Sequence, residues 1–396
     1  MRRATTSSLL RSINRGAILD LIRLHGPTSR TQIASQLNVS LPTVMRVVDE
    51  LIEENLVVQP HGKNESTRGR PRSLLEFNPG AYGVIGVDLG SVNMLGTFTD
   101  LAGTIQHEVI IQRTSDDPQR NLQELCDLID KLLATPRLPD QLVRGIGIAV
   151  PGVVAINEGI VDWAPSLNWR DFPLRKHLQD RFNLPIFIEN DANLAALGEL
   201  AFGAGRGAQN LVCINIGVGI GAGIILGGRL YRGHHQAAGE IGYLLPSIEY
   251  LGRQYDQFGA LEYFADGLGI TRRASELLEK SSEPVPSTDL KTEEVFAAAR
   301  KGARWAQQVV RETVDYIALA VAAISALFDP EVIVLGGAVA YSSDLLIEPI
   351  LDRITGVVPY EPRFVTSPLG QHAAVKGATL LVLNGTMDSV QITELL

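Results

Sequence analysis

The segment from Gly239 to Phe264, GEIGYLLPSIEYLGRQYDQFGALEYF, combines acidic side chains, glycines and tyrosines in a pattern that indicates a ligand site. It contains neither cysteine nor histidine, the side chains that usually hold a structural metal. These residues alone leave three interpretations open: a working pocket, a metal site that has lost its ligands, and ordinary core.

Asn190 and Asp191 form a second candidate group. They follow the apolar, strand-like run LPIFIE, and a helix is expected from about Ala192. Open α/β sheets bind ligands at the carboxyl ends of their strands, so this position suits a binding site. Asn and Asp are also favoured helix N-caps, so a purely structural role as a cap is the alternative.

Two similar segments must position these residues. GVIGVDLGSVNMLGTFTD and LVCINIGVGIGAGIILGG are each expected to form a buried strand, a small-residue turn and a returning strand, which indicates an internal repeat. Gly217, Gly219 and Ala222 of the second segment loosely match the dinucleotide-binding fingerprint. That fingerprint requires a helix directly after the turn, so we reject the match.

The first 77 residues predict a separate helical unit. A first helix ends at Gly26-Pro27, a second begins at Ser29 in a capping box with Gln32, and a third is capped by Ser40. The short turn LNVS joins the last two, which predicts a helix-turn-helix. The inward-facing residues of the third helix are expected to be Val44, Val47, Val48 and Leu51.

The outward face of the third helix is expected to present Leu41, Thr43 and Arg46 to the major groove of DNA. The following residues alternate apolar ends around a polar middle, as in a β-hairpin wing. The wing tip, TRGRPR, is a slim cationic segment that can follow phosphates or enter a minor groove; its arginines are Arg68, Arg70 and Arg72. Together these features predict DNA binding.

The charge distribution agrees with this division. Eleven basic and six acidic residues lie within the first 72, so this head carries +5 and the rest carries −14 of the total −9. The local electrostatic field decides whether a surface attracts nucleic acid, so only the head is expected to bind DNA.

The apolar runs are too short to span a membrane, and no secretory signal begins the sequence, which favours a cytoplasmic protein without membrane contact. Cys126 and Cys213 are too few for a disulfide framework.

Five motifs carry a family resemblance. In order along the body they are GIAVPGVV, IENDANLAALGEL, GVGIGAGIILGGRL, AAGEIG and DPEVIVLGGAV. They resemble the ROK family (repressors, open reading frames and sugar kinases), and with its head the chain is similar to the family's regulators of the xylose and N-acetylglucosamine repressor type. The resemblance implies an α/β fold: a winged helix-turn-helix (1–77) and a two-lobed actin-like, ribonuclease H-like sugar-kinase body. Its lobes would be 78–196 with about 372–396, and 197–371.

The resemblance also implies a sugar site between the lobes, with contacts from Asn190, Asp191, Glu240 and Glu262. In the family's kinases the residue matching Asp191 is also the base that accepts the proton of the attacking hydroxyl. The kinase phosphate loops are altered in this chain, where Ser91, Val92, Asn93 and Val218 replace glycine, threonine, lysine and threonine. The lost hydroxyls and lysine predict that sugar binds without phosphorylation and that ATP is not a cofactor.

Family members commonly hold a structural zinc in the segment described first. The positions of its histidine and three cysteines are occupied by Tyr243, Arg253, Tyr255 and Ala260. These side chains do not make a structural zinc site, so no zinc is expected. The loop is expected to be held by packing of Tyr250, Tyr255 and Phe258 instead. Tyr243 either contacts the sugar or fills the space of the histidine.

These inferences predict a sugar-responsive transcriptional regulator, expected to be a repressor of carbohydrate genes. Its expected partners are operator DNA, a small sugar effector and further copies of itself in a homodimer or tetramer. Two alternatives are an ATP-dependent sugar kinase with an accessory DNA-binding head and a DNA-binding scaffold with a vestigial pocket. The long apolar helix around residues 310–328 is expected to be buried, in the core or at a subunit interface.

Overall fold

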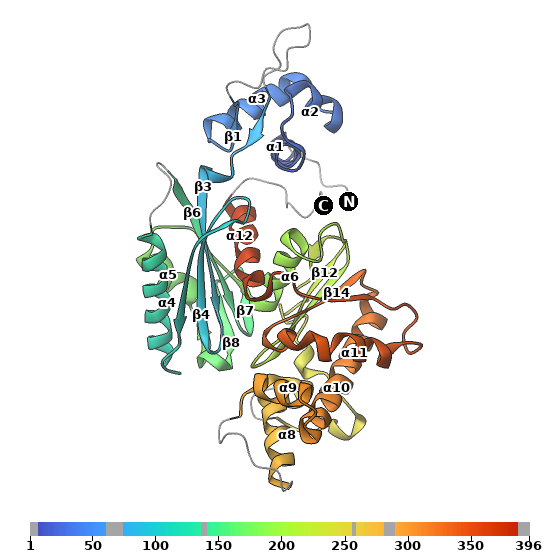
Figure 1. The fold of residues 1–396 in the computed structure, drawn as a ribbon. Coiled ribbons are helices and arrows are strands. Elements are labelled where there is room, and N and C mark those ends of the chain that lie inside the picture. The colour runs from blue at the N-terminus through green and yellow to red at the C-terminus, as the bar shows by residue number, and fades with distance from the viewer. Residues whose placement is uncertain (1–6, 61–73, 136–140, 256–258, 281–289, 387–396) are drawn as a thin grey trace.

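The computed structural model describes residues 7–60, 74–135, 141–255, 259–280 and 290–386. A small helical head lies at one end of a two-lobed body, and each lobe contains a five-stranded sheet (Figure 1). No helix in the described ranges combines the length and apolar character needed to cross a membrane.

The head has the predicted three helices and a short antiparallel strand pair. Its elements are α1 (Ser7–His25), α2 (Arg30–Leu37), α3 (Leu41–Glu53), β1 (Val57–Val58) and β2 (Glu76–Phe77). Ser29 and Gln32 form the predicted capping box, and the Ser40 side chain caps α3 by accepting from the Thr43 N–H. The buried residues of α3 are the predicted Val44, Val47, Val48 and Leu51.

The first lobe has the strand order β10-β6-β3-β4-β5. Helices α4 and α5 and a three-stranded sheet cover one face, while α6 and α12 lie on the other (Figure 1). The lobe's elements are η1 (Pro79–Ala81), β3 (Tyr82–Leu89), β4 (Asn93–Asp100), β5 (Ile105–Gln112), α4 (Pro118–Leu133), β6 (Leu142–Val150), β7 (Val153–Ala155), β8 (Ile160–Ala164), η2 (Pro165–Leu167), β9 (Trp169–Phe172), α5 (Leu174–Arg181), β10 (Ile186–Asn190), α6 (Asp191–Phe202), η6 (Gly370–His372) and α12 (Ala373–Thr386).

The second lobe repeats this plan with the strand order β13-β12-β11-β14-β15. Its elements are β11 (Leu211–Ile216), β12 (Ile220–Leu226), β13 (Arg229–Leu230), η3 (Ile241–Tyr243), η4 (Ile248–Tyr250), α7 (Ala260–Ala265), α8 (Gly267–Lys280), α9 (Thr292–Arg300), α10 (Arg304–Phe328), β14 (Val332–Gly336), η5 (Ala338–Leu345), α11 (Ile347–Ile354) and β15 (Arg363–Thr366). When the five strands of each sheet are numbered along the chain, their order across the sheet is third, second, first, fourth, fifth in both lobes. This shared order confirms the internal repeat and the actin-like fold class.

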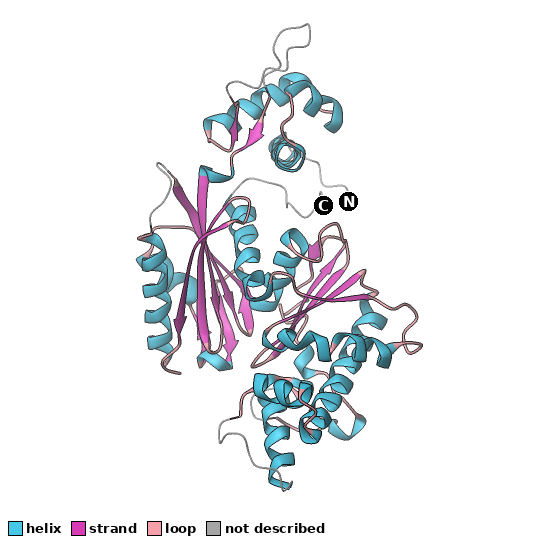
Figure 2. Cartoon of the chain, viewed as in Figure 1, coloured by secondary structure: helices cyan, strands magenta, loops and turns pink. Residues whose placement is uncertain are grey.

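Helices α6 and α12 form the layer between the two sheets (Figure 2). They approach closely through glycines: a Cβ at Gly198 would lie 2.1 Å from the Ala373 carbonyl oxygen, and one at Gly377 would lie 1.9 Å from that of Leu194. Beyond this crossing, Val382 of α12 joins the core of the head. The head and the first lobe therefore share one continuous core.

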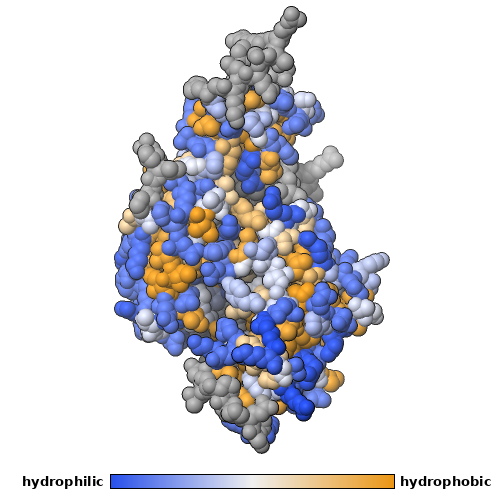
Figure 3. Space-filling model, viewed as in Figure 1, coloured by the Kyte–Doolittle hydropathy of each residue, from blue (hydrophilic) through white to orange (hydrophobic). Residues whose placement is uncertain are grey.

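Helix α10 is buried along one side in the second-lobe core. On its other side, Leu319 and Leu327 are 50% and 72% exposed. The core therefore accounts for only part of its apolar character. On the face shown in Figure 3, hydrophilic side chains cover most of the surface and hydrophobic ones gather in separate patches.

Candidate functional site

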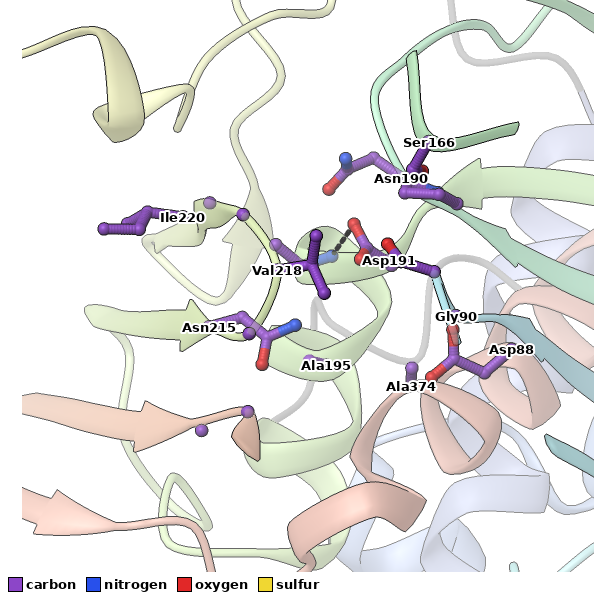
Figure 4. Close-up of a pocket in the computed structure, with 18 of the residues that line it drawn as sticks. Asp88, Gly90, Ser166, Asn190, Asp191, Ala195, Asn215, Val218, Ile220 and Ala374 are labelled. Atoms are coloured by element: carbon purple, nitrogen blue, oxygen red, sulfur yellow. Dashed lines mark hydrogen bonds between the residues drawn. The ribbon is translucent and has the colours of Figure 1, made fainter. Parts of the chain in front are cut away.

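A cavity of about 690 Å³ lies between the two lobes. The residues predicted to bind a ligand all line it: Asn190, Asp191, Glu240, Tyr243 and Glu262. Asn190 and Asp191 come from the first lobe, and the other three from the second. Figure 4 shows Asp191 facing Val218 of the second lobe across this space, with Asp88 nearby. The fold thus brings residues more than 70 positions apart in sequence into one site.

Asn190 and Asp191 are held by the junction of β10 and α6. The Asn190 Oδ1 accepts from the Asn193 N–H (3.0 Å), and its Nδ2 donates to the Gly152 carbonyl (2.9 Å). Asp191 Oδ1 accepts from the Ala192 N–H at 2.8 Å. Asn190 is therefore the helix cap that the sequence left as an alternative, yet both side chains also line the cavity.

Four carboxyl groups converge on the cavity, and burial raises the pKa of each. The pKa of Asp191 is about 6, and that of Asp88 is about 7, where the charge of Asp191 adds to the effect of burial. Burial and Asp191 likewise raise the pKa of Glu240 to about 7. Burial raises the pKa of Glu262 to about 8, and this side chain is only 6% exposed. Hydroxyl donors from a polyhydroxylated ligand would relieve this mutual repulsion.

An ion pair between a buried glutamate of the first lobe and a partly exposed arginine of the second joins the two lobes. Glu189, 1% exposed, accepts from the Arg232 Nε at 2.8 Å. Its other carboxylate oxygen accepts from the Asn190 N–H and the Asn193 Nδ2, both at 3.0 Å. No motif in the sequence predicted this pair. The local signal is Glu189 itself, an acidic residue that directly follows three apolar residues of β10.

Aromatic side chains complete the cavity wall. Trp163 lies on β8 and Tyr341 on η5, and both line the cavity together with Tyr243. The guanidinium of Arg170 lies 4.3 Å from the Trp163 ring centroid. Neither Trp163 nor Tyr341 stands near a recognisable motif, so the sequence did not predict their place in the cavity wall.

The two loops that hold phosphates in kinases also reach the cavity. Val218 occupies the turn between β11 and β12. Ser91 and Val92 lie in the turn between β3 and β4, and Asn93 is the first residue of β4. Val92 is 55% exposed. Arg113 supports this second turn from behind, since its guanidinium donates to the Ser91 carbonyl at 2.6 Å and its side chain is 4% exposed.

Aromatic contacts hold the loop between Tyr243 and Phe264. The Tyr250 and Phe264 rings lie 5.0 Å apart, the Tyr255 and Tyr263 rings 5.2 Å apart, and the Arg253 guanidinium 5.3 Å from the Tyr250 ring. Phe258 lies outside the described residues. Within the described part of the chain, no group of three or more His, Cys, Asp or Glu side chains could hold a metal. Tyrosine, arginine and alanine at the family's ligand positions do not fit zinc.

The candidate DNA-binding face lies on α3, on the side of the head away from the body (Figure 1). Leu41 is 40% exposed, Arg46 is exposed and Thr43 is half-buried. Met45, 48% exposed, joins this face and was not predicted. The Thr43 hydroxyl lies 2.8 Å from the Ser40 hydroxyl, so it also supports the helix cap. The predicted wing arginines, Arg68, Arg70 and Arg72, lie outside the described residues.

Comparison with known proteins agrees with this architecture. The ROK family model matches residues 84–384, and the MarR family model matches residues 12–64. The chain belongs to the ROK family.

Two relatives resemble nearly the whole chain, and a third resembles the body. The xylose repressor of Caldicellulosiruptor bescii is 30% identical, with 96% of this chain and 98% of that protein covered. The crystal structure of a ROK family transcriptional regulator, a homolog of the E. coli MLC protein, has a TM-score of 0.82 at 26% identity and covers 97% of this chain and 98% of its own. A ROK family glucokinase from Streptomyces griseus, in complex with glucose and AMPPNP, has a TM-score of 0.66 at 28% identity and covers 75% of this chain and 98% of its own.

Proposed function

We propose that this ROK protein is a cytoplasmic, sugar-responsive DNA-binding regulator that acts as a repressor of carbohydrate genes. The observation that carries the proposal is the union, in one molecule, of an exposed α3 face and an acid-lined interlobe cavity, joined through the core that α12 shares with the head. The likeness to a xylose repressor along nearly the whole chain supports the same function.

The sugar effector is proposed to bind Asn190, Asp191, Glu240 and Glu262 and to leave the cavity unphosphorylated. Phosphoryl transfer needs donors that hold the transferred phosphate. Val218 brings no hydroxyl to one of the two turns that face the cavity. In the other turn, Val92 brings no hydroxyl either, and Asn93, which follows it, brings no lysine ammonium, although Ser91 still brings a hydroxyl. A ligand can change DNA affinity only if it prefers one arrangement of the lobes, so sugar is proposed to act by biasing that arrangement.

The test uses the full-length protein and duplex DNA selected from a random library. Arg46→Ala is expected to weaken binding to the selected DNA by about tenfold or more, because Arg46 lies on the exposed face of α3. Arg353→Ala, which removes an exposed arginine of the second lobe, is the control and should leave the gel shift unchanged. In parallel, a thermal-shift panel of sugars should find a ligand whose stabilisation Asp191→Asn abolishes. Unchanged gel shifts with Arg46→Ala would remove the DNA-binding claim.

A sugar kinase with a DNA-binding head is the second candidate, favoured by the position of Asp191 between the lobes and by the likeness of the body to a glucokinase. A coupled assay with ATP, Mg²⁺ and the stabilising sugar decides between the two. We expect no turnover. Turnover that Asp191→Asn abolishes would establish the kinase instead.

We also propose that the protein acts as a homodimer or tetramer. Paired recognition helices match the two half-sites of an operator. The exposed leucines of α10 offer apolar surface for such an assembly.

A further inference from the structure

A buried polar bridge joins two walls of the cavity. One wall is the turn between β3 and β4, which contributes Ser91, and the other is η2, which contributes Pro165 and Ser166. The bridge consists of Arg113, whose side chain is 4% exposed, and Asn121, which is fully buried. Neither bridge residue is among the described residues that line the cavity, so the bridge supports the walls without forming them.

Arg113 holds the first wall at two points. Its backbone N–H donates to the Val92 carbonyl at 3.0 Å, and its Nη1 donates to the Ser91 carbonyl at 2.6 Å. Its Nε donates in another direction, to the Asn121 Oδ1 at 3.1 Å. The planar guanidinium makes these side-chain bonds in a fixed fork, which the single ammonium group of a lysine does not reproduce. The position of the turn is thus tied to the position of Asn121.

Asn121 carries the bridge to the second wall. Its amide uses both its acceptor and its donor: the Oδ1 accepts from Arg113, and the Nδ2 donates to the Leu167 carbonyl at 3.2 Å. The Trp169 Nε1 donates to the Pro118 carbonyl at 3.2 Å, so the first turn of α4 also holds the residues that follow η2. Buried carbonyls need donors, so loss of the Asn121 amide would leave the second wall without one of its supports.

These bonds fix the two walls relative to each other, although the bonded residues come from four separate segments of the chain. A polyhydroxylated ligand must meet several donors and acceptors at once, so a small shift of one wall weakens every bond made to that wall. We propose that Arg113 and Asn121 are positioning residues for the effector, which hold the β3–β4 turn and η2 at the separation at which the cavity binds sugar. The proposal rests on the proposed sugar-responsive function and extends it to residues that do not contact the ligand.

Two variants of the full-length protein break the bridge. Asn121→Leu keeps a side chain of similar size but removes both hydrogen bonds, and Arg113→Lys keeps the positive charge without the fork. Thr99→Val is the control, because Thr99 is also fully buried in the first lobe and its hydroxyl lies 2.9 Å from that of Thr379. Neither threonine is among the described lining residues. Arg113→Lys decides the question even if Asn121→Leu does not fold.

Stability and sugar affinity are measured separately. Denaturant unfolding gives the stability, and calorimetry with xylose, glucose and N-acetylglucosamine gives the affinity at a temperature where every variant is folded. All three variants are expected to lose stability. Only the two bridge variants should also bind more weakly whichever sugar the parent binds, by about five- to tenfold. The double variant should bind about as weakly as the weaker-binding single variant, because both residues act through one bridge.

Tryptophan fluorescence separates positioning from a purely structural role. Trp163 lines the cavity on β8, which leads directly into η2. Trp305→Phe in every protein removes the tryptophan of the second lobe. At saturating sugar, the emission of the bridge variants should differ from that of the parent, whereas Thr99→Val should match it. An unchanged affinity or an unchanged emission in both bridge variants overturns the inference and leaves the proposed function standing. If the parent binds none of a wide panel of sugars, the proposed function fails and this inference fails with it.

Discussion

At the scale of single residues, the cavity carboxyls carry an energetic cost that a ligand can relieve. Asp191, Glu240 and Glu262 repel one another in a partly dry space, and burial is the largest cause of each raised pKa. A group whose pKa is raised in the folded protein binds protons more tightly there than in the unfolded chain. Its ionisation therefore costs stability. Such groups are typical of functional sites, because structure alone would favour apolar side chains in their place.

Glu262→Gln tests this cost. The pKa of Glu262 is about 8 in the folded protein against 4.5 for an ordinary glutamate. The folded protein therefore holds the Glu262 proton more tightly than the unfolded chain does. The stabilisation from this bound proton is complete below about pH 4.5 and is lost as pH rises towards 8. The variant should therefore gain thermal stability relative to the parent at pH 8 and gain less at pH 5, in the absence of sugar. Glu249→Gln, at an exposed position outside the cavity, is the control and should show no pH-dependent difference. A stability difference that stays constant between pH 5 and pH 8 would contradict the assignment.

At the scale of elements, the sequence predicted the features that depend on residues close together along the chain. Caps and periodicity located the helices of the head, and the strand-turn-strand repeats located β3–β4 and β11–β12. The motifs carrying Asp191 and Glu240 predicted that both line the cavity. The Glu189–Arg232 pair, the part of Asp88 in the acid group and the wall residue Trp163 were missed. Each depends on how separate segments meet in space, which no local pattern records.

The segment between β13 and η3 links the two lobes in a way that the sequence did not indicate. Near its start, Arg232 donates a hydrogen bond to the buried Glu189 of the first lobe. Further along, the Gln236 Oε1 accepts from the Ile156 N–H of the first lobe at 3.3 Å. It ends at Glu240 in the cavity. The position of Glu240 therefore depends on contacts with the opposite lobe.

Arg232→Ala should both destabilise the protein and weaken sugar binding. Removing the guanidinium leaves a buried carboxylate without one of its partners, which costs about 1 to 3 kcal/mol. Arg353→Ala breaks a pair with Asp315 whose side chains are 49% and 55% exposed, and should cost less than about 1 kcal/mol. Denaturant unfolding and sugar titration measure the two effects. The double variant Arg232→Ala/Glu189→Gln should recover part of the stability, and equal losses in the two arginine variants would rule out a special role for this pair.

At the scale of the whole molecule, one chain of contacts connects the cavity with the head. Helix α6 begins at Asp191 and crosses α12 at Gly198 and Gly377. Val382, near the end of α12, packs in the same core as the helices of the head. Helix α6 packs against α12 and also against β11 and β12 of the second lobe, so we expect a change in the angle between the lobes to act on α6. Because α12 contacts both α6 and the head core, it can pass that change to the DNA-binding face.

Val382→Ala tests this route. Val382 is fully buried where α12 meets the head core, so the smaller side chain loosens that junction at a cost of about 1 to 3 kcal/mol. Val295→Ala, at a fully buried position on α9 in the second-lobe core, makes the same chemical change away from this route and is the control.

The coupling free energy between sugar and DNA comes from the operator affinity measured with and without sugar, and sugar titration gives the affinity of the cavity for sugar. Val382→Ala should keep its sugar affinity but lose at least half of the coupling free energy, whereas Val295→Ala should keep both. If the two variants lose coupling to the same extent, general destabilisation explains the effect, and the signal does not pass through the contact of α12 with the head.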